Sequence, residues 1–188
     1  MHAIIRLFDR FLRWRLGVFE FCSESACLFR VRIAPAPHAI PLPGGQVPAG
    51  APVLELHLWN EHVPRIPPEG PDLAWAARLR RMLIATFRSL ARQIPRDPRL
   101  ADVQAVGGVS VLVVRGDDLE VTKLVSGLGF TVFPYRNPLG RFGEFWENFY
   151  TWGLMWAFNE ASLRQRHLMR LRRAEAWMAV DEFRQRFG

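Results

Sequence analysis

A short polar strand in the first half of the chain gathers side chains that can exchange protons and bind polar ligands. Residues 53–62 alternate leucines with other residue types, which is typical of a strand that buries only one face. The second face and the residues just after it carry titratable and aromatic groups in place of the usual small polar ones. These residues are Glu55, His57, Trp59, Asn60, Glu61 and His62. We expect them to form the functional site.

Glu55 and His57 are two residues apart, so their side chains share one face of the strand at a spacing of about 7 Å. A carboxylate in this position can orient an imidazole. One hypothesis is therefore an enzyme in which His57 acts as general base, Glu55 or Glu61 orients it, and an arginine stabilises negative charge. The alternative is an ordinary solvated strand face whose polar groups bond a neighbouring loop.

Other chemical signatures are weak or missing. Histidine and carboxylate mixtures do bind zinc or iron, but one strand does not supply a complete ligand set, so we predict no metal. The chain has no Gly-x-Ser-x-Gly elbow and no phosphate-binding loop, and it does not indicate a particular cofactor. Asp117-Asp118 fits a helix cap. Cys22 and Cys27 lack the Cys-x-x-Cys spacing and are expected to be reduced and buried.

Composition indicates a single globular domain over residues 1–188, because 49% of the 188 residues are hydrophobic. The net charge is +7, and all but one of the 25 basic residues are arginine. Such a charge permits nucleic acid, anionic lipid or acidic polymers as partners. No nucleic-acid motif organises the arginines, so we expect no sequence-specific nucleic-acid binding. The oligomeric state is not indicated.

Hydropathy predicts a cytoplasmic protein, with attachment to a membrane surface as an alternative. The sequence contains no apolar run of the length that spans a bilayer. Charged residues interrupt the N-terminal apolar segment, which argues against a signal peptide. Residues 3–16 form an amphipathic helix that could lie on a membrane. We expect it instead to pack on the sheet or the C-terminal helices, burying Ile4, Phe8, Phe11 and Leu12.

Helices and strands alternate without a regular βαβ rhythm. Strands are predicted at 27–33, 53–59, 103–106, 109–114 and 130–133. Helices are predicted at 3–16, 71–94, 117–127, 144–158, 160–173 and 181–187. Proline and glycine make 34–52 and 60–71 loops. The pattern predicts an α+β fold with a mainly antiparallel sheet packed with helices and a helical C-terminal region.

Two further clusters lie in this C-terminal region. Aromatic residues are dense between 145 and 158, and we expect most of them in the core and some in a pocket or subunit interface. Arg166, Arg170 and Arg173 share one face of the helix predicted at 160–173, where a solvated surface is the simpler reading and phosphate or lipid binding the alternative.

Several segments, taken in order, resemble the YkoP-like domain of bacteria. The most specific of them runs from Glu55 to Glu61 and reads Glu-Leu-His-Leu-Trp-Asn-Glu. The others are Phe29-Arg30-Val31-Arg32, Asp102 to Gly108, Leu128 to Val132, Phe158 to Leu163 and Arg173 to Met178. Together they cover nearly the whole chain.

The resemblance implies a place for the site and not a mechanism. Domains of this family occur alone or joined to polysaccharide deacetylases. The chain lacks the Thr-Phe-Asp-Asp-Gly motif of a deacetylase, and His57 and His62 are one residue too far apart for its histidine pair. We therefore expect an accessory or ligand-binding domain linked to cell-envelope or polysaccharide metabolism. Its ligand would be a carbohydrate or a small anion, with Arg30 or Arg32 beside the histidine face.

Three function classes thus stay open. They are the accessory binding domain, a small enzyme using His57, and a peripheral membrane protein held by the 3–16 helix. An enzyme needs a concave and partly dry site around His57, whereas a binding domain can have an open one. A membrane protein needs the apolar side of the 3–16 helix to be free.

Overall fold

A computed structural model describes residues 2–65, 67, 69, 72–110, 124–135, 137–158 and 173–188. Its helices are α1 (His2–Leu16), α2 (Leu73–Gln93), α4 (Gly140–Phe158) and α5 (Val180–Phe187). Two short 3-10 turns, η1 (Ile94–Arg96) and η2 (Pro98–Leu100), follow α2. Its strands are β1 (Phe29–Pro35), β2 (Ile40–Leu42), β3 (Gly45–Val47), β4 (Pro52–Leu58), β5 (Ala105–Ser110), β6 (Thr131–Pro134) and β7 (Ala174–Ala179).

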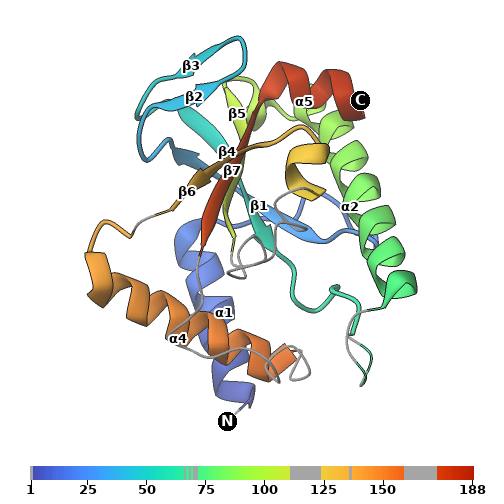
Figure 1. Ribbon diagram of the computed structural model, residues 1–188, viewed down its shortest axis with the longest axis vertical. Coiled ribbons are helices and arrows are strands. Elements are labelled where there is room, and N and C mark those ends of the chain that lie inside the picture. The colour runs from blue at the N-terminus through green and yellow to red at the C-terminus, as the bar shows by residue number, and fades with distance from the viewer. Residues whose placement is uncertain are drawn as a thin grey trace.

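Five strands form one sheet in the order β1-β4-β5-β7-β6, and β2 and β3 form a separate hairpin. The neighbours β4 and β5 are parallel, and every other neighbouring pair in the sheet is antiparallel. The prediction of an α+β fold with a mainly antiparallel sheet is therefore confirmed. Figure 1 shows the sheet running through the upper half of the molecule, with α1 and α4 at the opposite end from the hairpin and α5.

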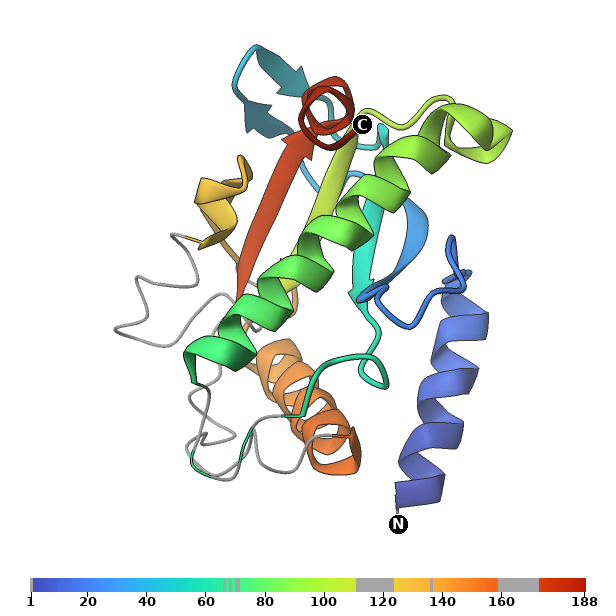
Figure 2. The same cartoon turned by 90° about the vertical axis from the view of Figure 1, so that its right-hand side faces the viewer.

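The main core lies between one face of the sheet and the helices α2 and α5. Figure 2 shows α2 crossing this face diagonally. Leu54, Val106 and Met178 point from the sheet toward Phe87 of α2 and Phe183 of α5, and all five are buried. Each such side chain contributes roughly 1.5–3 kcal/mol when fully buried, so this face holds the fold together.

Helix α2 begins where its sequence predicts, because the Asp72 carboxylate accepts a hydrogen bond of 2.6 Å from the Trp75 N–H. Near its other end, Thr86 ties the helix to the start of β1. Its hydroxyl accepts from the Leu28 N–H at 3.0 Å and donates to the Met82 carbonyl at 2.7 Å.

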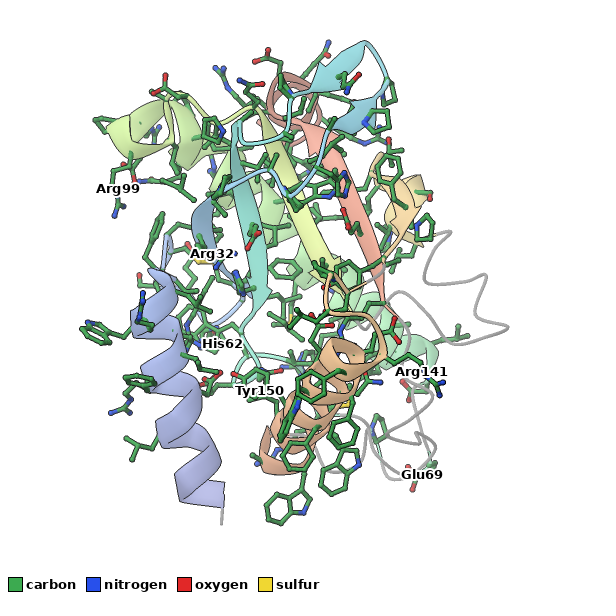
Figure 3. The ribbon with its side chains drawn as sticks, turned by 90° about the vertical axis from the view of Figure 1, so that its left-hand side faces the viewer. Arg32, His62, Glu69, Arg99, Arg141 and Tyr150 are labelled. Carbon is green, nitrogen blue, oxygen red and sulfur yellow. A yellow bond between two sulfur atoms is a disulfide. The ribbon has the colours of Figure 1, made fainter. Side chains whose placement is uncertain are left out.

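The second face of the sheet is covered in two places. The hairpin packs over its upper part through a smaller cluster that includes Ile40, Val47, Val53 and Trp177. Helix α4 lies over its lower end, and α1 contacts α4. Figure 3 views the molecule from this side, with the hairpin and α4 in front of the sheet.

Three predictions about elements were wrong. Residues 174–179, left outside every predicted element, form β7. The strand was not predicted because a strand that is buried between two neighbours shows no alternation of apolar and polar residues. The proline-rich segment 34–52 contains the β2–β3 hairpin, which turns at Pro43-Gly44. Strand β5 continues through both Gly107 and Gly108 and is not interrupted by them.

Other predicted segments agree with the structure or lie outside its described part. The helices predicted at 3–16, 71–94, 144–158 and 181–187 all form, with shifted ends. The helix predicted at 160–173 and most of that at 117–127 fall on residues outside the description. None of the described helices is both long and apolar enough to cross a bilayer.

The expectation of two reduced cysteines was also wrong. The structure joins Cys22 and Cys27 by a disulfide. The turn between them brings their Cα atoms to 6.6 Å, which is within the range that a disulfide bridges. Spacing alone did not reveal this turn, which contains no glycine or proline.

Candidate functional site

The pairing of β1 with β4 gathers the predicted site residues into one strip on the second face of the sheet. In this antiparallel register Arg32 lies opposite Glu55, and Arg30 lies opposite His57. Opposite residues of antiparallel strands point to the same side, so these four side chains are neighbours. The leucines between them point to the main core, as the alternation predicted.

One half of this strip is a partly open charged group formed by Arg32, Glu55 and His57. The Glu55 Oε2 atom accepts from Arg32 Nε at 2.9 Å and from Arg32 Nη2 at 2.5 Å. The same oxygen lies 3.4 Å from His57 Nε2, which is close enough for charge attraction but is not an aligned hydrogen bond. The His57 side chain keeps 35% of its surface exposed although its Nε2 atom is buried, so a ligand would approach the rest of the ring.

Electrostatics keep Glu55 ionised in this group. Burial alone would raise the pKa of the carboxyl, since a low-dielectric environment disfavours charge. The His57 contact and the positive charge of Arg32 outweigh burial, so the pKa of Glu55 is lowered. The resulting carboxylate can hold an imidazole and a guanidinium in fixed positions.

The other half of the strip is held together by contacts among its own residues, and its Glu61 stays 38% exposed. Arg30 is buried, donates from Nε to Glu20 at 3.0 Å and lies 3.5 Å from Glu61 through Nη1. Its guanidinium carbon is 4.1 Å from the centre of the Trp59 ring, a cation–π contact. The His62 ring stacks on the other side of Trp59 at 3.8 Å.

This stack uses both faces of the Trp59 ring, so Trp59 does not offer a stacking surface to a ligand. His62 is fixed further by a contact of 2.7 Å from Nδ1 to the Cys27 carbonyl. Asn60 lies in the turn between the two rings. Figure 3 labels Arg32 and His62, which lie on the two halves of the strip. His57 and Glu61 keep 35% and 38% of their side-chain surface exposed, and we take Arg32, Glu55 and His57, which lie outside the Trp59 stack, as the centre of the candidate site.

The structure also shows a hollow away from the strip. A hollow of about 490 Å³ lies between the end of α2 and α5, on the other side of the molecule, and is lined by Arg92, Arg96, Asp181 and Arg184 among others. Glu55 and His57 do not line this hollow, and the expectation that they lie in or beside the main concave pocket stays a prediction. In the described part of the chain no three His, Cys, Asp or Glu side chains gather as a metal site would require.

The YkoP domain family matches residues 2–187, which is almost the whole chain. The chain belongs to this family. Comparison with curated proteins and with solved structures gives no match. The family match thus covers the strip around His57 together with nearly all of the chain, and the family assignment itself names no reaction or ligand.

Sequence reasoning missed a buried polar network between α4 and the lower end of the sheet in this YkoP domain. Its centre is Arg173, the residue before β7, whose side chain is 7% exposed. Arg173 donates to Asn148 and, at 3.0 Å, to Thr151. Its Nη1 atom is also 3.6 Å from Glu147, which accepts from the Tyr135 hydroxyl at 2.9 Å.

Burial is the dominant influence on the charges of this network. It lowers the pKa of Arg173, with Glu147 acting against it, and it raises the pKa of Tyr135 to about 12 together with Glu147. Arg173 was expected on a solvated helical face, so its burial corrects that expectation. Only the polar spacing of Glu147, Asn148 and Thr151 along one side of α4 could have indicated the network.

A second missed contact joins α1 to α4. The Tyr150 hydroxyl of α4 donates to Asp9 of α1 at 2.9 Å, and Arg13 lies 3.0 Å from the other oxygen of Asp9. Asp9 is only 7% exposed. Burial and the Asp9 carboxylate raise the pKa of Tyr150, which therefore stays a donor at neutral pH.

The N-terminal helix packs on a C-terminal helix, as expected, because α1 contacts α4, but the expected burial of Phe11 was wrong. We expected Phe11 to be buried, but it is 53% exposed, and Trp14 is 75% exposed. Leu12 is half-buried, and the side chains of Ile4 and Phe8 lie outside the described part of the structure. The helix turns its charged side inward, which hydropathy alone does not reveal.

Proposed function

We propose that this YkoP domain is an accessory ligand-binding domain of cell-envelope or polysaccharide metabolism, and that its ligand contacts Arg32, Glu55 and His57. The observation that supports the proposal is the charged group itself, which is preorganised on a rigid sheet and remains accessible. Arg32 and Glu55 are fixed by a two-point contact, and His57 stands beside them with a third of its surface free.

A carbohydrate suits this group chemically. Sugar hydroxyls both donate and accept hydrogen bonds, and the three side chains offer a carboxylate acceptor between two donors. Val109 of β5 is 41% exposed and follows on the same face of the sheet, where it provides an apolar contact for the C–H groups of a sugar ring. A uronic acid would add a carboxylate for Arg32 or His57 to bind.

Nuclear magnetic resonance titration of the full chain tests this proposal. The probes are a neutral N-acetylglucosamine oligomer and a uronic-acid oligomer, each added to the wild-type protein. We expect the His57 ring signals to shift on saturation with one of them. His57→Ala and Arg32→Met should weaken that binding at least about tenfold, which corresponds to loss of one charge-assisted hydrogen bond.

Arg81→Met is the matched control, because Arg81 is an exposed arginine on α2, on the other side of the sheet. It should leave binding unchanged. The proposal fails if neither oligomer shifts the His57 signals. It also fails if Arg32→Met and Arg81→Met bind equally well.

A second candidate is an enzyme in which His57 is the general base, favoured by the 3.4 Å contact between His57 and Glu55. Mass spectrometry of the incubated oligomers separates the two candidates. An enzyme would generate products, and Glu55→Gln would slow their formation more than it weakens binding. A binding domain would leave the oligomers intact over the same period.

A further inference from the structure

Helices α1 and α4 each turn an apolar stripe outward and a polar group inward. This arrangement is the reverse of the usual one in a water-soluble domain. Both helices lie at the end of the molecule opposite the hairpin (Figure 1), and they contact each other.

In α1 the outward side is formed by Leu7, Phe11 and Trp14, which are 67%, 53% and 75% exposed. At about 100° per residue these three positions fall on one stripe, and Asp9 and Arg13 fall on the opposite side. The inward side is the one that meets Tyr150 of α4. The helix is thus held by polar contacts while its apolar stripe has no cover among the described residues.

Helix α4 repeats this arrangement. Its outward stripe is a continuous aromatic cluster in which neighbouring rings lie 5.5 to 6.4 Å apart, made of Phe142, Phe145, Trp146 and Phe149. Phe142 and Trp146 are 68% and 53% exposed. The opposite side carries the Glu147, Asn148 and Thr151 groups that meet Arg173.

The inward networks fix this orientation. Rotating α4 to bury its rings would take Asn148 and Thr151 away from the buried Arg173, and rotating α1 would take Asp9 away from the Tyr150 hydroxyl. A buried polar or charged group that loses its partner costs free energy. The orientation is therefore a property of the folded domain and not a loose arrangement. Exposed apolar surface of this extent marks a binding surface for an apolar phase or partner.

The charged residues beside the two apolar stripes indicate what kind of partner binds them. Arg10 and Arg15 are exposed and lie on either side of the α1 stripe, and Arg141 is exposed at the start of α4. The acidic Asp9 is turned inward, and Glu144 lies on the α4 side that attracts Arg173. Arginines flanking an aromatic stripe are typical of helices that lie in the interface of an anionic membrane.

We propose that α1 and α4 bind the surface of an anionic lipid bilayer. Their aromatic stripes enter the boundary between headgroups and acyl chains, and Arg10, Arg15 and Arg141 lie among the lipid phosphates. A second copy of this chain fits the surface less well, because it would bring the same arginines against each other in a molecule of charge +7. This inference is independent of the ligand proposed for Arg32, Glu55 and His57.

Vesicle flotation of the full chain tests the inference. One set of vesicles is pure phosphatidylcholine, and the other contains equal parts of phosphatidylcholine and phosphatidylglycerol. We expect flotation with the second set and little with the first, and a decrease at high salt. Brominated acyl chains should quench part of the tryptophan fluorescence of the unmodified protein, which requires no variant.

Paired variants locate the surface. Phe11→Ser with Trp14→Ser, or Phe142→Ser with Trp146→Ser, should lower the vesicle partition coefficient at least about tenfold, because each exposed aromatic contributes apolar area. Leu73→Ser is the matched control, since Leu73 is 89% exposed at the start of α2. Arg10→Glu with Arg15→Glu should also reduce flotation, whereas Arg78→Glu with Arg81→Glu on α2 should reduce it less.

Circular dichroism melting of each variant shows whether the fold is kept. The inference is overturned if the unmodified chain does not float with anionic vesicles, or if lipid bromination leaves its fluorescence unchanged. It is also overturned if the serine variants float like Leu73→Ser. A dimer in size-exclusion chromatography that the serine variants dissociate, without any flotation, would identify the surface as a protein interface and refute lipid binding.

Discussion

Glu55 is the residue on which the open half of the strip depends, because its one oxygen holds both neighbours. Arg32 approaches it from β1 by two nitrogens, and His57 approaches it from two residues further along β4. The sequence predicted the Glu55 and His57 pair from period-two spacing alone. It did not predict that Arg30 and Arg32 differ in access, because that depends on Glu20 and Trp59, which pack around Arg30 only in the folded chain.

Replacing Glu55 by glutamine should change the acid sensitivity of the domain. The folded pKa of Glu55 is lowered, so its ionised form stabilises the protein above the ordinary value of 4.5, and this stability is lost as pH falls through the folded pKa. Glu55→Gln should therefore cost about 1–3 kcal/mol near neutral pH and progressively less in acid. Urea denaturation across this pH range measures the difference, and parallel curves for both proteins would contradict it.

Gly107 should be irreplaceable for steric reasons. A Cβ atom there would lie 2.6 Å from Trp177 Cε3 and would overlap the Ala176 carbonyl of the adjacent strand. Gly107→Ala should therefore destabilise the domain by about 3 kcal/mol or prevent folding, which is the upper end of overpacking costs. Gly127→Ala is the control, because nothing lies within 4 Å of its Cβ position. Thermal melting that is equal for both variants would show that the strands separate to accept a methyl group.

At the scale of elements, His38 adds a polar contact between the β2–β3 hairpin side of the molecule and β7. His38, in the loop before β2, lies 2.9 Å from the buried Glu175 carboxylate through Nε2 and 3.0 Å from the Ala39 carbonyl through Nδ1. Both neighbours are acceptors, so only the doubly protonated imidazolium satisfies both. Glu175 also accepts from the Trp177 indole at 3.0 Å.

The hairpin should therefore loosen as pH rises. Hydrogen bonding to Ala39 and attraction by Glu175 outweigh desolvation and raise the pKa of His38 above 6.5. Stability from the charged form is complete below pH 6.5 and is lost as pH rises through the higher folded value. Hydrogen exchange of Ile40 and Val47 amides, corrected for intrinsic rates, should quicken across that window. His38→Ala should remove the pH dependence of the exchange rates. An unchanged pH profile in that variant would refute the proposed role of the His38–Glu175 contact.

The elements also show where sequence patterns stop being informative. Amphipathic spacing located α1 and α2, and alternation located β1 and β4. Strand β7 was missed because Ala174 to Ala179 lacks β-branched residues and is buried on nearly every position. The orientation of α1 was wrong because the partner of Asp9 is Tyr150, 141 residues away, and no local pattern reports such a contact.

At the scale of the whole molecule, the sheet separates two different kinds of packing. On one face α2 and α5 bury a conventional apolar core. Toward the other end α4 and α1 attach through Arg173 and Asp9 and leave their rings outside. The apolar core under α2 and α5 thus stabilises the fold, while α1 and α4 present an exposed apolar surface. A bilayer contact at α1 and α4 and a ligand at His57 use different residues.

The net charge of +7 gives a last prediction, for nucleic acid. Exposed arginines are distributed over α1, over α2 and near α5. Arg92, Arg96 and Arg184 line the hollow between α2 and α5, and the arginines of α1 lie at the opposite end of the molecule. We therefore expect weak, non-specific binding at low salt that comes from counterion release and decreases steeply as salt rises. Fluorescence anisotropy with labelled duplex DNA, single-stranded DNA and RNA measures it at two salt concentrations.

Scrambled sequences of equal length serve as the control for specificity. Affinity should be equal for scrambled and unscrambled strands, and the slope of log affinity against log salt should report only the number of phosphates neutralised. The Arg10→Glu and Arg15→Glu pair and the Arg78→Glu and Arg81→Glu pair should weaken binding by similar amounts, because each removes the same charge. A preference for one sequence, or sub-micromolar affinity that survives physiological salt, would mean that the basic residues form an organised nucleic-acid surface.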